Sequence, residues 1–351
     1  MALPPLPAQP ASVPWPTDDW PTGPVPESAD RLGVGADFDF AFSAAAAEEI
    51  GVTHALLVVQ GGRLVAERYA QGMGPEDTFP SWSMAKSITQ ALAGLLVGEG
   101  RLDIRAPADV PEWRGPGDGR GAITLDQLLR MSSGLKWLEA YIPGEASDVI
   151  EMLFGAGSDD VAHFAAGAPL AHPPGTFFYY SSGTSNIVSR CLARALGASA
   201  EAFAAFMRER LFGPLGMKTP APRFDAAGTF IGSSYCFAST RDFARFGLLY
   251  LRDGVWEDRR LLPKGWVDYA RTPTYQQPGA VELDGPYGAH WWLELAGPGS
   301  FSANGYAGQF VICCPDRDLI IARNGETPLE LEPALKPWLA KLAGRFGPAA
   351  R

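Results

Sequence analysis

Apolar and polar residues alternate with two different periods along the chain, and each change of period marks a change from strand to helix. Residues 54–70 read HALLVVQ, then GG, then RLVAERYA, which is two β-rich runs separated by Gly61 and Gly62. Two glycines between such runs predict a hairpin with a tight primed turn. Residues 37–50 are rich in helix formers and predict a helix before the hairpin.

After Ser83 the pattern takes the period of a helix. Apolar residues recur every three or four positions from Ile88 to Leu96, and Gly98 then ends the helix. Further helices are predicted over 184–196, over 199–213 and after Ser239. Residues 124–127 form a capping box that opens another.

The last third of the chain returns to short β-rich runs, at 290–296, 309–314 and 318–324, and closes with a helix over 328–345. Strands therefore lie at both ends of the sequence and helices in the middle. This order predicts an α+β fold, in which an antiparallel sheet flanked by helices carries an inserted all-helical lobe. The expected division is an α/β lobe of 37–100 and 226–351, a helical lobe of 101–225, and an active site between the two.

Nine prolines fall within the first 26 residues, so residues 1–36 are expected to form a proline-rich arm laid over the body. The arm begins without a basic and apolar leader, and no run of 18 apolar residues occurs in the chain. These features predict a cytoplasmic protein. The net charge of −10 opposes binding to nucleic acid or to anionic membranes.

The four cysteines lack the C-x-x-C spacing of zinc or redox sites and are expected to be reduced core residues. Cys313 and Cys314 are neighbours in one β-rich run, so they should point to opposite faces of a sheet. The sequence has no H-E-x-x-H motif, no G-x-S-x-G motif and no glycine-rich phosphate loop. No metal and no cofactor are therefore expected.

Three short motifs carry candidate chemistry, and each has a purely structural alternative. Ser83 and Lys86 lie three residues apart at a helix start, where a lysine made neutral by its surroundings would activate the serine. Alone, such a pair is more often a solvated serine and lysine. Residues 174–183 could aim Tyr180 and a hydroxyl into a cleft, or form a turn with buried aromatic residues. Residues 304–310 hold two glycines before a strand, which allow close approach of a substrate or form an ordinary turn.

Taken in this order, the motifs resemble the serine β-lactamase and penicillin-binding-protein superfamily. The class C-like branch, with its esterases and 6-aminohexanoate-dimer hydrolases, is the most similar. The resemblance spans about residues 45–325 and includes the phrases WSMAKSITQALAGLLVGEG, ITLDQLLRMSSGL and PGTFFYYSSGTSN. It implies a serine hydrolase that cleaves a small-molecule ester or amide.

The resemblance also assigns roles to residues. It implies that Ser83 is acylated, that Lys86 is its general base or proton relay, and that Tyr180 carries a proton to the leaving group. The oxyanion hole would be formed by the backbone N–H groups of Ser83 and Gln309, without need of the Gln309 side chain. Substrate contacts are implied for Ser182, Tyr306, Gly308 and, by a looser alignment, Tyr141, for which a packed surface tyrosine is the alternative.

Two departures from the family pattern bear on the substrate. The third motif reads Tyr306-Ala307-Gly308, without the lysine that would hold a substrate carboxylate, and Ser182 stands where an asparagine is more usual. Both changes favour a carboxylesterase or a 6-aminohexanoate-oligomer amidase. The alternatives are a β-lactamase or DD-peptidase-like enzyme, or a penicillin-sensor-like binding module that does not turn over.

Overall fold

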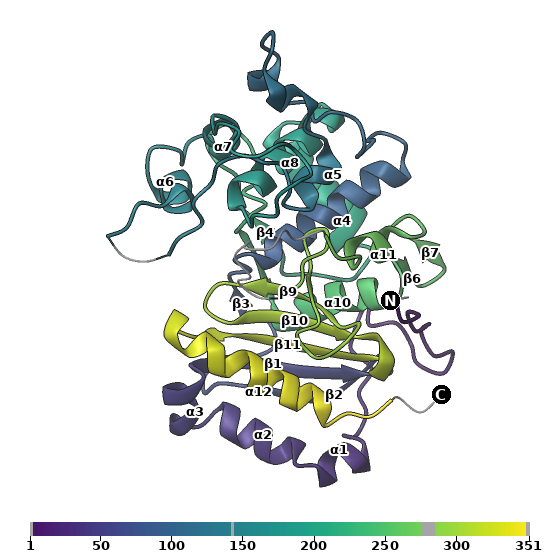
Figure 1. Ribbon diagram of the computed structural model, residues 1–351. Coiled ribbons are helices and arrows are strands. Elements are labelled where there is room, and N and C mark those ends of the chain that lie inside the picture. The colour runs from purple at the N-terminus through teal and green to yellow at the C-terminus, as the bar shows by residue number, and fades with distance from the viewer. Residues whose placement is uncertain (1–2, 142–143, 275–284, 349–351) are drawn as a thin grey trace.

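A six-stranded antiparallel sheet lies in the lower half of the molecule, and a helix-rich region stands above it (Figure 1). The computed structural model describes residues 3–141, 144–274 and 285–348. The strand order is β2-β1-β11-β10-β9-β8, so strands from both ends of the sequence share one sheet. Their bounds are β1 Val52–Gln60, β2 Arg63–Tyr69, β8 Trp292–Leu293, β9 Phe301–Gly305, β10 Gln309–Cys314 and β11 Leu319–Glu326. The predicted fold class is confirmed.

Gly61 and Gly62 join β1 to β2 and both have positive φ, 59° and 76°. Positive φ at both central residues defines the primed turn that matches the twist of a hairpin. The predicted hairpin is therefore confirmed. Short strands form two smaller sheets, one of β3 Thr78–Phe79, β5 Cys236–Ser239 and β4 Ala221–Pro222, the other of β6 Val255–Trp256 and β7 Arg259–Arg260.

Alternate residues of the sheet enter two separate apolar cores, one on each face. Leu56 and Val58 of β1 pack with helices α2 Val34–Ala41, α3 Ala44–Glu49 and α12 Glu332–Gly344. Leu57 and Val59 face the larger core, which contains α4 Met84–Gly98 and α10 Thr240–Leu251. Cys313 and Cys314 fall into different cores, as their adjacency on a strand predicts, and all four cysteines are free and buried.

The region above the sheet is built from short helices and loops. Its α-helices are α5 Leu125–Leu129, α6 Asp148–Phe154, α7 Val161–Ala166, α8 Ser182–Leu196 and α9 Ala200–Met207. The 3-10 turns η1 Pro111–Trp113 and η2 Gly119–Ala122 lie beside them, and Arg208–Phe212 continues α9 as a π-helical turn (η3). The predicted capping box of Thr124 and Gln127 is present at α5. The division into lobes at residues 100 and 225 stays a prediction.

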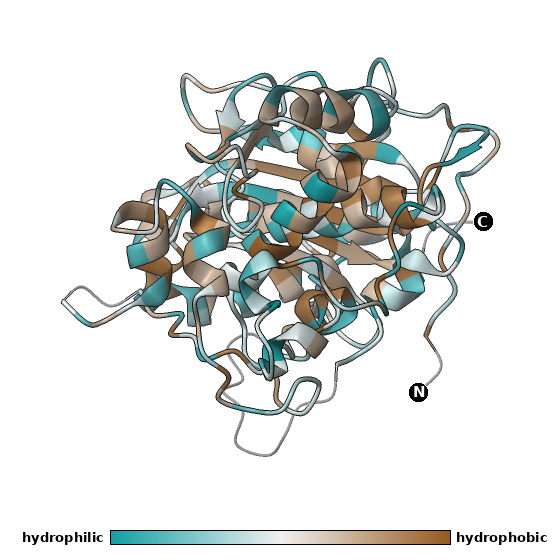
Figure 2. Ribbon diagram, turned by 90° about the horizontal axis from the view of Figure 1, so that it is seen from above, coloured by the Kyte–Doolittle hydropathy of each residue, from teal (hydrophilic) through white to brown (hydrophobic). Residues whose placement is uncertain are grey.

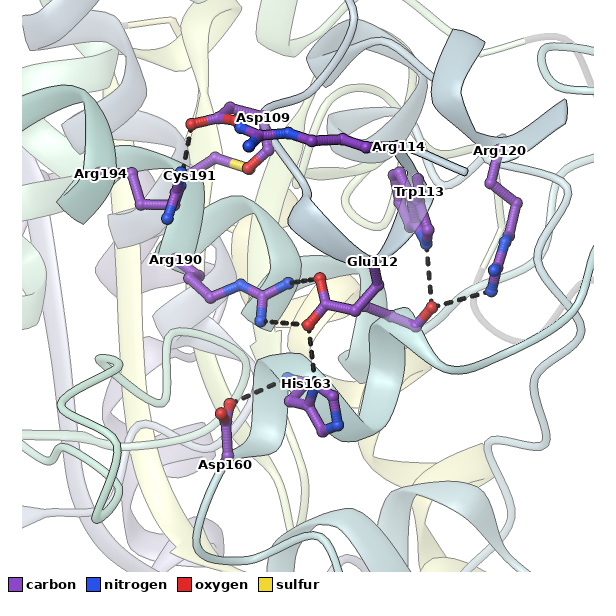
Figure 3. A network of polar contacts seen from close by, with 11 residues as sticks. Asp109, Glu112, Trp113, Arg114, Arg120, Asp160, His163, Arg190, Cys191 and Arg194 are labelled. Atoms are coloured by element: carbon purple, nitrogen blue, oxygen red, sulfur yellow. Dashed lines mark hydrogen bonds and ion pairs between the residues drawn. The ribbon is translucent and has the colours of Figure 1, made fainter. Parts of the chain in front are cut away.

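A polar network ties three of these elements together (Figure 3). The carboxylate of Glu112 in η1 accepts two hydrogen bonds from Arg190 of α8, at 2.9 and 2.7 Å. His163 of α7 lies 2.7 Å from the same carboxylate. Burial acts to raise the pKa of Glu112, but the hydrogen bonds with Arg190 and His163 outweigh it and lower this pKa to about 2. This network stabilises the helical region at a distance from the motifs singled out above.

The N-terminal arm lies against the body, held by arginine side chains. Arg245 donates to the carbonyl of Pro16 at 2.7 Å, and Arg271 donates to the carbonyl of Pro4 at 2.7 Å. The arm is shorter than expected, because helix α1 spans Glu27–Arg31 and α2 begins at Val34. Proline prevents helix formation only as far as residue 26, and the chain resumes helical structure at once.

Two expected elements differ from those observed. The helix predicted over 37–50 is interrupted at 42–43, where Ser43 caps α3 by accepting a hydrogen bond from the Ala46 N–H. The strand predicted over 290–296 is only β8, because His290 and Glu294 have positive φ and bend the chain on either side. The remaining elements are α11 Trp266–Ala270 and the 3-10 turns η4 Pro315–Arg317 and η5 Leu329–Leu331.

Apolar residues gather in the central elements when the molecule is viewed from above, while the outer loops are mostly hydrophilic (Figure 2). Among the described residues, no helix combines the length and the apolar character needed to cross a bilayer.

Candidate active site

Ser83 is the residue immediately before helix α4, and it lines a pocket of about 410 Å³. One helical turn later, Lys86 directs its Nζ to 3.0 Å from Ser83 Oγ. This contact follows from the helix itself, because residues three apart lie on the same face. The two side chains are therefore placed for proton transfer.

Lys86 is buried, with 1% of its surface exposed. Its Nζ also donates to Ser182 Oγ at 2.9 Å and to the carbonyl oxygen of Ser233 at 3.0 Å. Burial lowers the pKa of Lys86 to about 8, against the attraction of Glu139, which acts in the opposite direction. Because a charged amine is costly in a desolvated site, a larger fraction of Lys86 is neutral near neutral pH than of a lysine in water.

Tyr180 precedes helix α8 and also lines the pocket. Lys86 Nζ lies over its ring, 4.7 Å from the centroid, and the ring stacks on Trp292 at 5.3 Å. Burial, helped by the nearby Tyr287, Tyr141 and Glu139, raises the pKa of Tyr180 well above its usual value, while a hydrogen bond with Ser83 acts to lower it. Tyr180 is therefore a neutral phenol beside Ser83.

Ser182 is the first residue of α8 and lies behind Lys86. Its Oγ lies 2.5 Å from Glu139 Oε1, and its backbone N–H donates to Glu139 Oε2 at 2.8 Å. Tyr141 lines the pocket and donates its hydroxyl to the same carboxylate at 2.6 Å. Ser182 thus contacts Lys86, whereas Tyr141 lines the pocket.

Glu139 was not predicted from the sequence, although it lines the pocket. Its side chain accepts hydrogen bonds from Tyr141 and from Trp137 Nε1, the latter at 2.6 Å. The three residues stand two apart in the sequence, and alternate residues of an extended segment lie on the same side. The sequence signal that could have indicated Glu139 is this spacing, in which one acid stands between two aromatic hydrogen-bond donors.

The third motif reaches the site through β9. A Cβ atom on Gly305 would clash with the carbonyl oxygen of Ser81, so the β9 backbone runs directly against the segment that leads to Ser83. Asn304, Gly305 and Tyr306 line the pocket. Tyr306 packs its ring against Tyr141, with centroids 5.3 Å apart.

Gln309 and Gly308 are not among the residues that line this pocket. Gln309 is in β10, opposite Gly305 in the ladder, and its side-chain amide donates to the carbonyl of Gly325 at 2.7 Å. Gly308 has a φ of 81°, and its carbonyl accepts a hydrogen bond from the buried Arg323 at 2.7 Å. Both residues shape the turn that follows Tyr306, and the substrate contact expected of Gly308 stays a prediction. Tyr306 directly follows β9, whereas Gln309 begins the next strand, β10.

The pocket has a volume of about 410 Å³ and is lined by both parts of the molecule. Its lining residues include Ser83, Glu139, Tyr141 and Tyr180. The other lining residues include apolar side chains and a pair of charged residues on α12, and among them are Trp292, Tyr306, Phe310, Leu329, Glu332, Pro333 and Lys336. Among the described residues, no three potential metal-ligating side chains cluster together.

Comparison with known proteins agrees with this geometry. The family model described as Beta-lactamase matches residues 43–343. The 6-aminohexanoate-dimer hydrolase of Paenarthrobacter ureafaciens is 26% identical over 303 residues, which cover 82% of this chain and 75% of that protein.

Solved structures show the same fold. A protein of Bacillus anthracis, provisionally assigned as a 6-aminohexanoate-dimer hydrolase, superposes with a TM-score of 0.75 at 21% identity, over 97% of this chain and 90% of that chain. A family VIII carboxylesterase superposes with a TM-score of 0.66 at 14% identity, over 92% of this chain and 99% of that chain. With the family model matching most of its length, the chain belongs to the Beta-lactamase family and is a serine hydrolase.

Proposed function

We propose that the protein hydrolyses a linear ester or amide through an acyl-enzyme on Ser83, in a crevice between the two lobes. The observation that carries this proposal is the 3.0 Å contact between Lys86 Nζ and Ser83 Oγ in a site where the lysine is buried. The neutral amine takes the proton of Ser83, and Oγ attacks the substrate carbonyl carbon. The bond to the leaving group then breaks, and water later releases the acid.

Lys86 is a better base than Tyr180, because the surroundings lower the pKa of the lysine and raise the pKa of the tyrosine. Burial brings the pKa of Lys86 down to about 8, whereas the pKa of Tyr180 rises well above its usual value. At neutral pH roughly one lysine in ten is free to accept a proton, while the phenol stays protonated. Tyr180 therefore serves as the proton donor to the leaving group, replenished from the Lys86 ammonium.

The negative charge that develops on the carbonyl oxygen needs two donors. Ser83 N–H at the start of α4 supplies one, and we assign the second to the backbone N–H of Tyr306 in place of Gln309. The close passage of β9 along Ser81 and the position of Tyr306 on the pocket wall support this assignment. One such donor is worth roughly 3 kcal/mol in the transition state.

The pocket favours an extended substrate with an apolar stem. Its lining includes the apolar Trp292 and Phe310 and the charged Glu332 and Lys336. A stem with a polar terminus, as in an oligomer of an ω-amino acid or a short-chain ester, matches this distribution of apolar and charged residues. A carboxylesterase or a 6-aminohexanoate-oligomer amidase is thus the finer proposal, consistent with the relative named above.

A panel of substrates tests the proposal. Wild type is expected to hydrolyse a short-chain p-nitrophenyl ester or a linear 6-aminohexanoate oligomer faster than a cephalosporin, and Ser83→Ala to lose at least about a thousandfold in kcat. Ser43→Ala, at the cap of α3 on the far face of the sheet, is the matched control and should retain full activity. Undiminished turnover by Ser83→Ala would refute the mechanism. A fluorophosphonate that labels Ser83 without product release from any substrate would instead indicate a binding module.

A further inference from the structure

Four hydrogen-bond donors converge on the carboxylate of Glu139. Ser182 Oγ and Tyr141 Oη donate to Oε1, while the Ser182 backbone N–H and Trp137 Nε1 donate to Oε2, all within 2.8 Å. The Ser182 N–H also belongs to the start of the 15-residue helix α8, where negative charge is favoured. An ionised carboxylate can only accept hydrogen bonds, so the hydroxyl of Ser182 must give its proton to Glu139.

The direction of this hydrogen bond determines how Ser182 interacts with Lys86. With its proton committed to Glu139, Ser182 Oγ can only accept from Lys86 Nζ, which lies 2.9 Å away. The carbonyl of Ser233, 3.0 Å from Nζ, is likewise an acceptor only. A neutral amine has two N–H groups and one lone pair. The two acceptors take both N–H groups, and the lone pair is left for the third neighbour, Ser83.

We propose that Glu139 is a positioning residue that sets the direction of the hydrogen bonds around Lys86, so that the neutral amine presents its lone pair to Ser83. The inference rests on the proposed function, since it concerns the step in which Lys86 takes the Ser83 proton. Glu139 acts through Ser182 and needs no contact with the reacting atoms.

The variant Glu139→Gln should reverse the direction of the hydrogen bond between residue 139 and the Ser182 hydroxyl, with little change in the shape of the side chain. The Ser182 N–H and Trp137 Nε1 are fixed donors, so the amide oxygen of glutamine faces them. Its NH2 group then faces Ser182 Oγ and Tyr141 Oη. Ser182 accepts this new bond, and its own proton turns to the Lys86 lone pair, in competition with Ser83. We expect kcat to fall roughly 100-fold, within the range that general-base catalysis contributes.

The charge of Glu139 has a separate effect that the experiment must remove. Its attraction raises the pKa of Lys86, so the glutamine variant should reach its alkaline plateau at lower pH than wild type. The other titratable groups that face Lys86 are Tyr180 and His290. Tyr180 stays protonated, and burial lowers the pKa of His290 to about 3, so neither titrates in this range. Rates are therefore compared on the plateau, where Lys86 is neutral in every variant.

A double-mutant cycle gives the decisive test, with kcat for a p-nitrophenyl ester measured on the plateau. In Ser182→Ala no hydroxyl can compete for the lone pair, so adding Glu139→Gln to it should cost less than about threefold, against roughly 100-fold in the presence of Ser182. Glu112→Gln removes a carboxylate of the same region far from Lys86 and should retain wild-type kcat.

Each outcome has one meaning. Equal losses from Glu139→Gln in both backgrounds, or full activity of the single variant, would overturn the inference. The proposed function is checked separately, by fluorophosphonate labelling of Ser83 in wild type. Labelled, active wild type with an additive cycle would refute the role of Glu139 alone, whereas activity that survives in Ser83→Ala would refute the mechanism on which it rests.

Discussion

Gly305 of β9 lies against the carbonyl oxygen of Ser81, so closely that a Cβ atom at residue 305 would overlap that oxygen. The contact sets the distance between the strand and the segment that leads to the nucleophile. It also sets how near the backbone of Tyr306 can come to Ser83. Both of these residues line the pocket.

Gly305→Ala is therefore expected to move β9 away from Ser83 and to lower kcat about a hundredfold, as a displacement of about 1 Å in an active site can. KM should change less, because the apolar wall of the pocket remains. Steady-state kinetics with a p-nitrophenyl ester measure both values. Gly74→Ala is the control, since a Cβ atom there meets nothing within 4 Å. Unaltered kcat in Gly305→Ala would show that the approach of β9 does not matter.

The activity should follow the ionisation of Lys86. Because the neutral amine is the base, kcat/KM should rise about tenfold per pH unit up to a pH of about 8 and then level off. Lys86→Arg should lack this limb and lose most activity, since an arginine stays charged. Lys341→Arg, on the exposed side of α12, is the matched control. A profile that is flat between pH 6 and about 9 would contradict a lysine base.

Gln309 offers a test of how the turn after β9 is held. Its amide nitrogen donates to the carbonyls of Tyr306 and Ala307, at 3.2 and 3.0 Å, and its Oε1 accepts from Asn324 at 2.9 Å. Gln309→Met keeps the volume but leaves these buried groups unpaired, so the free energy of unfolding should fall by roughly 3 kcal/mol. The kcat should fall as well, because the backbone of Tyr306 is less firmly placed.

The control for Gln309→Met is Gln60→Met. Gln60 is buried at the far end of β1, where its side chain donates to the carbonyls of Arg317 and Gly347. The Gln60→Met variant should have a lower free energy of unfolding but an unchanged kcat. Chemical denaturation and kinetics on the same samples separate the two effects. If Gln309→Met loses stability but keeps full kcat, the turn does not position the oxyanion donor.

Local patterns predicted the elements well, and contacts between distant segments explain what they missed. The hairpin at Gly61 and the helix after Ser83 depend on neighbouring residues, which a sequence displays directly. The sequence did not show that Tyr306 lines the pocket and Gln309 does not, because the part of the turn that comes near Ser83 depends on the packing of β9 against Ser81. Glu139 was missed because two of its four donors belong to Ser182, 43 residues away.

The pairing of β1 with β11 has a consequence for how the chain acquires its structure. Residues 270 positions apart, Thr53 of β1 and Arg323 of β11, hydrogen bond to each other through their side chains. A nascent chain emerging from the ribosome can form the hairpin and several helices early, but β1 cannot pair with β11 until residues 319–326 have been synthesised. Such long-range pairing slows folding and leaves apolar strand surface open in the meantime. Chains that stop short of β11 are therefore expected to be substrates for chaperones and proteases.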